Sequence, residues 1–139
     1  MVHKKFRHDM KRGFGSCILT LKSCTDIEEY REDVAWGVKN ALAYDAQCEG
    51  TRANYFYDMI TLFSDWSEFY SIVAAGAKRN LKGRDWKFAY YTEILTLMAA
   101  DGFAAAQQTL DELYDMLLKA IQSGRRTNIG LFPLLKLFR

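Results

Sequence analysis

Apolar residues recur at the three- and four-residue spacing of an α-helix along almost the whole chain, and strand-like alternation is absent. In the segment 12–23, for example, Phe14, Cys17, Ile18 and Leu21 fall on one helical face. The single proline, Pro133, lies near the end of the chain, so no proline interrupts a helix before it. The sequence therefore predicts an all-α fold.

Acidic residues that can cap helices recur along the chain and suggest an internal repeat. Asp26, Asp65 and Asp101 are separated by 39 and 36 residues, and each precedes a helical stretch. A period near forty that is built from two helices is typical of an α-solenoid, in which each helix pair buries its apolar face on the next. The predicted organisation is a basic N-terminal arm at 1–11, three helical hairpins at about 12–44, 51–80 and 85–123 within a region 12–128, and an apolar cap or partial repeat at 129–139.

One stretch of the chain is similar to a known repeat family. The run from Asp26 through Val34-Ala35 to Ala41-Leu42 resembles the second helix of a HEAT repeat, in degenerate form. The segment 45–52 is similar to a junction in uncharacterised bacterial HEAT-like proteins. This resemblance implies a right-handed α–α superhelix of about three antiparallel helix pairs with a C-terminal segment. It implies no reaction.

The residues that usually carry catalysis or bind metals are few. The two histidines, His3 and His8, fall in the expected N-terminal arm, so we expect no ordered imidazole base. Phosphate-binding loops, dinucleotide motifs and HExxH are absent from the sequence. Cys17, Cys24 and Cys48 lack the close spacing of a structural zinc site, and we expect reduced thiols in a cytoplasmic protein. The sequence therefore predicts a protein that is not an enzyme and has no metal and no cofactor.

Two candidate recognition surfaces follow from the repeat interpretation. Trp36 lies about 200° around its helix from Val34 and would share the concave face of a HEAT-like stack with Asp33 and Asn40. The segment 45–52 has closely spaced opposite charges, which are typical of a shaped turn before a helix but also of a polar recognition loop. Both interpretations of this loop stay open. Its candidate recognition residues are Asp45, Gln47, Glu49 and Arg52.

Basic and acidic residues are distributed unevenly along the chain. The net charge is +4 over residues 1–12, −6 over 13–77 and +4 over 78–139. In a HEAT-like stack the N-terminal cations would share one edge with the turns that follow the second helices, and such an edge could contact an acidic protein surface or phosphates. The predicted basic edge consists of Lys11, Arg12, Lys78, Arg79, Lys82, Arg84, Lys87, Arg125 and Arg126.

These features together predict a non-catalytic protein–protein interaction or scaffold module that uses a concave helical surface and a basic edge. The alternative is binding of a nucleic-acid phosphate backbone through the basic edge. No membrane partner is expected, because the longest apolar stretch, from 129 to 138, is shorter than the roughly twenty residues that span a bilayer. We expect that segment to fold back as a cap, or else to contact a second copy of the chain.

Overall fold

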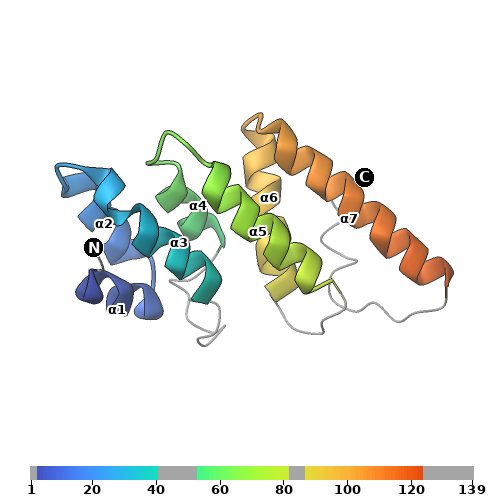
Figure 1. The fold of residues 1–139 in the computed structure, drawn as a ribbon, viewed down its shortest axis with the longest axis horizontal. Coiled ribbons are helices and arrows are strands. Elements are labelled where there is room, and N and C mark those ends of the chain that lie inside the picture. The colour runs from blue at the N-terminus through green and yellow to red at the C-terminus, as the bar shows by residue number, and fades with distance from the viewer. Residues whose placement is uncertain (1–2, 41–52, 82–86, 124–139) are drawn as a thin grey trace. The chain divides into compact units, whose positions relative to one another are not determined.

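The fold was obtained as a computed structural model, which describes residues 3–40, 53–81 and 87–123. Every regular element within these ranges is helical, which confirms the all-α prediction. The chain divides into two compact units, residues 1–72 and 73–139, and the division falls within α5. The elements in chain order are α1 (Lys4–Arg12), α2 (Gly15–Ser23), a 3₁₀-helix (Ile27–Tyr30), α3 (Arg31–Asn40), α4 (Ala53–Ile60), α5 (Ser67–Arg79), α6 (Lys87–Ala100) and α7 (Ala104–Gln122) (Figure 1).

The N-terminal segment, which was predicted to be an arm at 1–11, forms the helix α1 and belongs to the first unit. Phe6 and Met10 lie four residues apart on α1, and both are buried. α1 ends at Gly13, whose φ of 151° is a backbone conformation that favours glycine. The predicted helix over 12–23 therefore begins only at Gly15, and Lys11 and Arg12 belong to the helix before it.

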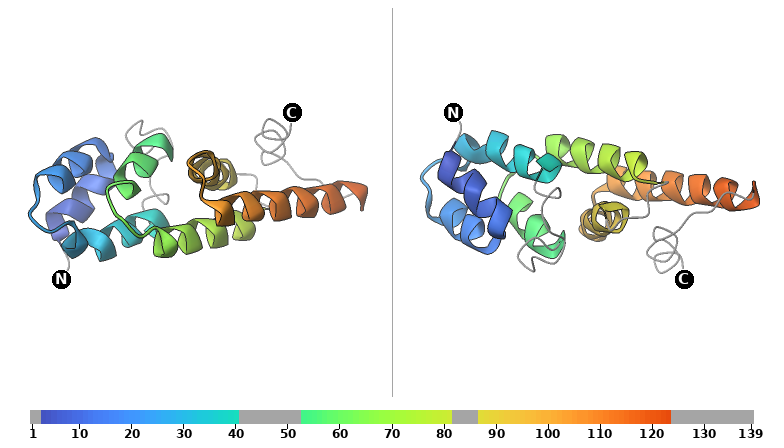
Figure 2. Two further views of the ribbon diagram at one scale, coloured as in Figure 1. Left: turned by 90° about the horizontal axis from the view of Figure 1, so that it is seen from above. Right: turned by 90° about the horizontal axis from the view of Figure 1, so that it is seen from below.

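The core of the first unit lies between helices α1 to α4, which pack against one another in pairs. α1 packs against α2 and α3, and α2 packs against α4. α1 and α2 lie side by side in Figure 2. The ring of Phe14, at the start of α2, meets the edge of Phe56 on α4 with centroids 5.7 Å apart. Both rings are fully buried, so this edge-to-face contact lies in the core of the first unit.

Two of the three expected acidic caps are present. Oδ1 of Asp26 accepts a hydrogen bond of 3.1 Å from the backbone N–H of Glu28, so Asp26 is the capping residue. Asp65 caps α5 in the same way through the N–H of Ser67, at 3.0 Å. Asp101 does not cap α7, which begins after Phe103 without a side-chain cap.

The second unit contains the later part of α5 together with α6 and α7, which pack closely on each other. In Figure 2, α6 is seen nearly end-on while α7 runs lengthwise, so the two helices cross obliquely. α6 ends at Ala100, and Gly102, which follows two residues later, has a φ of 88°. The N–H of Gly102 donates to the carbonyl of Ala99 and the N–H of Phe103 to that of Met98, which is a Schellman cap.

Several expectations about the architecture lie beyond these observations. The right-handed superhelix of three antiparallel pairs stays a prediction, as does the HEAT-like resemblance that suggested it. The candidate recognition loop at 45–52 and the apolar segment at 129–139 lie outside the described residues. None of the helices that the structure describes combines the length and the apolar character needed to cross a membrane.

Candidate functional site

One helix in the first unit, α1, carries its exposed basic side chains on a single face. All five of its lysine, arginine and histidine side chains other than Arg7 are exposed. At 100° per residue they fall within an arc of about 120°, and from first to last they extend over about 12 Å. We call this surface the α1 basic face; it consists of Lys4, Lys5, His8, Lys11 and Arg12.

The opposite side of α1 is fixed to the protein by a buried carboxylate on α3. Asp33 has no exposed surface. Its Oδ1 accepts hydrogen bonds from Nε of Arg7 at 2.6 Å and from the backbone N–H of His3 at 3.2 Å. Its Oδ2 lies 2.7 Å from Nδ1 of His3. We call these three residues the Asp33 cluster. Because all the partners of the carboxylate come from the N-terminal segment, the cluster ties α1 to α3.

The electrostatics of the Asp33 cluster favour the ionised carboxylate. Burial by itself would raise the pKa of Asp33, but the hydrogen bonds from Arg7 and His3 outweigh burial and lower the pKa below its usual value. Two rings support the donors: the ring of His3 stacks on Tyr30 at 4.2 Å, and the guanidinium of Arg7 lies 5.0 Å from the centre of the Trp36 ring.

This arrangement changes the interpretation of the concave-face residues. Asp33 was expected to contact a partner, but a fully buried carboxylate with three donors offers no surface to one. Trp36 is half-buried and lies beside Arg7, and Asn40 is exposed with its Nδ2 donating to the carbonyl of Trp36. A partner-binding role for Trp36 and Asn40 stays a prediction.

The histidine prediction also needs a correction. His3 was expected to lie in a basic N-terminal arm and to offer no ordered imidazole, whereas its ring is held by Asp33 and by Tyr30. Contact between an imidazole and a carboxylate is also found in catalytic dyads. Here the same carboxylate also accepts a hydrogen bond from Arg7, and the imidazole of His3 stacks on the ring of Tyr30. A structural role in holding α1 on α3 therefore explains the contact between His3 and Asp33.

The residues of the predicted basic edge fall in different parts of the chain. Lys11 and Arg12 belong to the first unit, and Lys78 and Arg79 to the second. Lys11 and Arg12 were expected at a helix start, but they occupy the last turn of α1, where the helix dipole favours cations. Nζ of Lys78 forms an ion pair with Glu112 at 3.1 Å. α6 begins at Lys87, and the remaining four residues, Lys82, Arg84, Arg125 and Arg126, lie outside the described residues.

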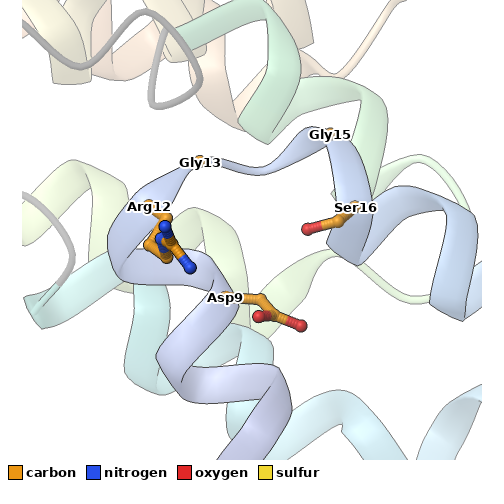
Figure 3. Close-up of a pocket in the computed structure, with 5 residues that line it drawn as sticks. All are labelled: Asp9, Arg12, Gly13, Gly15 and Ser16. Atoms are coloured by element: carbon orange, nitrogen blue, oxygen red, sulfur yellow. The ribbon is translucent and has the colours of Figure 1, made fainter.

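A hollow of about 380 Å³ adjoins the α1 basic face where α1 ends and α2 begins. Asp9, Arg12 and Ser16 direct their side chains toward it, and Gly13 and Gly15 form its backbone wall (Figure 3). The carboxylate of Asp9 and the guanidinium of Arg12 carry opposite charges. The lining therefore favours neither a simple anion nor a simple cation.

The cysteines that the structure describes are core or helix-end residues. Cys17 is buried, and burial, reinforced by the negative charge of Asp9, raises the pKa of its thiol to about 12. Cys24 is half-buried and its thiol donates to the carbonyl of Leu21. Within residues 3–40, 53–81 and 87–123, no three His, Cys, Asp or Glu side chains are grouped closely enough to hold a metal ion.

Part of the α1 basic face was not predicted as a helix face, although the spacing of its residues in the sequence is informative. Positions 4, 8 and 11 follow the period of a helix, as do 5 and 12. Phe6 and Met10 show the same period on the opposite side.

No family model matches this chain, and no curated protein and no solved structure matches it either.

Proposed function

We propose that the protein is a non-catalytic protein–protein interaction module and that the α1 basic face is its contact surface. One observation carries the proposal: five basic side chains are exposed on one face of a helix whose other face is buried. Cations held in this way attract an acidic partner and orient it on approach, because their positions are set by a packed helix.

The balance of charge in the first unit favours a protein partner over a nucleic acid. Residues 1–72 contain nine Lys and Arg against eleven Asp and Glu. Domains that bind nucleic acids are usually basic as a whole, because their affinity comes from many phosphate contacts. A single basic face on an otherwise acidic unit is better matched to a local acidic surface.

Two groups of kinds that enzymes often use for catalysis, the ring of His3 and the thiol of Cys17, have structural roles that support a non-catalytic function. His3 is engaged by Asp33 and stacks on Tyr30. The thiol of Cys17 is buried, and its raised pKa disfavours the nucleophilic thiolate.

Affinity capture with matched charge reversals tests this proposal. The bait pair is wild type and Lys4→Glu/Lys5→Glu; the control is Lys22→Glu/Lys39→Glu, which reverses two exposed lysines on α2 and α3. Bound proteins from an extract of cells that express the chain are quantified by mass spectrometry. We expect a protein that is retained by wild type and by the control and lost from the α1 variant.

Two results would count against the proposal. One is a partner that the α1 variant and the control retain equally well, which would place the contact elsewhere. The other is loss from both variants, which would point to general charge attraction. Circular dichroism of each bait establishes that the substitutions leave the helices intact.

A further inference from the structure

We infer that the α1 basic face binds a short acidic peptide segment, rich in Asp and Glu, rather than a nucleic acid. The inference rests on the proposed function and specifies the chemistry of its partner. It draws on the size of the face, on the number of cations that form it and on the net acidic charge of the unit that contains it.

The dimensions of the face fit a short segment. A length of about 12 Å corresponds to about four residues of extended peptide or about eight residues of helix. The cations occupy positions 4, 5, 8, 11 and 12, which is the stripe pattern of one helix face. Carboxylates at every third or fourth position of a helical partner would meet them in register.

The number of cations favours a short acidic segment over a nucleic acid. Three of the five side chains are lysines, Lys4, Lys5 and Lys11, and only Arg12 carries a guanidinium. Lysine and arginine both pair with carboxylates as well as with phosphates, so the side-chain chemistry does not separate the two anions. Nucleic-acid affinity comes from many phosphate contacts, whereas this face has five basic side chains on a unit with more acidic than basic residues.

The burial of the apolar side chains of α1 argues against insertion into a membrane. Because Phe6 and Met10 are buried, α1 has no free apolar face to enter a bilayer.

Fluorescence anisotropy with two labelled probes tests the inference. The first probe is a poly-glutamate peptide and the second a single-stranded thymidine oligonucleotide, each about ten residues long so that both exceed the face. Titrations of the full chain are made at about 50 mM and about 200 mM salt, because attraction between exposed charges is screened over this range. The variants are Lys4→Gln/Lys5→Gln and the matched control Lys22→Gln/Lys39→Gln, whose lysines are also exposed.

We expect the peptide to bind more tightly than the oligonucleotide at the same salt concentration. Lys4→Gln/Lys5→Gln should weaken peptide binding roughly three- to tenfold, the loss of two exposed ion pairs. The control should weaken it by less than about twofold. Affinity for the peptide should fall as salt is raised.

Three results would overturn the inference. Tighter binding of the oligonucleotide, with the same dependence on Lys4 and Lys5, would assign the face to nucleic acid. Equal losses in the two variants would mean that the face is not the site. Self-association that Lys4→Gln/Lys5→Gln abolishes, seen by light scattering, would assign the face to a second copy. If the peptide fails to bind while the captured partner still depends on Lys4 and Lys5, the proposed function stands and only the short-segment inference fails.

Discussion

Replacement of Asp33 by Asn should destabilise the first unit strongly, because it removes the charge at the centre of the Asp33 cluster while preserving the size of the side chain. The carboxylate accepts one short hydrogen bond from Arg7, at 2.6 Å, and has a second short contact with the ring of His3, at 2.7 Å. An asparagine has one acceptor oxygen, so its amide group would face one of these two groups.

The magnitude follows from these contacts. A hydrogen bond to a charged group contributes about 1.5–3 kcal/mol, and breaking a buried ion pair costs about 3–5 kcal/mol. Arg7 keeps some solvent contact, with 18% of its side chain exposed, and Glu32 lies 4.0 Å away. We therefore expect Asp33→Asn to lower the free energy of unfolding by about 2–4 kcal/mol.

Urea denaturation at neutral pH, followed by circular dichroism, measures this loss. The control is Asp58→Asn, which neutralises an exposed acid on α4 and should change stability by less than about 0.5 kcal/mol. If the two variants unfold at the same urea concentration, the cluster does not hold α1, and the reasoning is refuted.

The pH dependence gives an independent check. Because the pKa of Asp33 is lower in the folded protein than the unfolded value of about 3.9, its ionised form stabilises the fold. This stabilisation is complete above about pH 5 and is lost as the pH falls through the folded pKa. The stability difference between wild type and Asp33→Asn should therefore shrink below pH 4. A difference that stays constant into acid would contradict the assignment.

Two glycines at helix contacts give further predictions, both read from urea midpoints. A Cβ at Gly76 would lie 2.5–2.8 Å from the ring of Tyr91, so Gly76→Ala should cost about 1–3 kcal/mol through overpacking. A Cβ at Gly37 would lie 2.5 Å from the Sδ of Met10, whose flexible side chain can move, and alanine favours the helix by about 1 kcal/mol. Gly37→Ala should therefore change stability by less than about 1 kcal/mol, and a larger loss than that of Gly76→Ala would contradict this account.

The helices of this chain could be predicted from sequence because their causes are local. Apolar spacing predicted the all-α class. The caps at Asp26 and Asp65 were also expected from local sequence, and in both the aspartate side chain accepts the hydrogen bond. Local hydrogen bonds of this kind involve residues only two positions apart.

The features that depend on distant residues could not be predicted in the same way. α1 contains only two inward-facing apolar residues, Phe6 and Met10, among many charged ones. Because so short an apolar pattern does not identify the helices that cover it, the sequence of α1 resembles that of an exposed arm. Aspartate is a residue type that is usually exposed, so the sequence gives no sign that Asp33 is buried. Its burial is possible only because His3 and Arg7, from 26 to 30 positions earlier, supply donors to both carboxylate oxygens.

Lysine acetylation footprinting of the captured complex tests the central claim most directly. The extent of labelling of each lysine is compared between the free chain and the chain with its protein partner bound. We predict that Lys4, Lys5 and Lys11 become protected, while Lys22 and Lys39, which are also exposed in the same unit, are labelled as before. Unchanged labelling of α1 in the complex, or protection of Lys22 and Lys39 instead, would contradict the assignment of the α1 basic face as the contact surface.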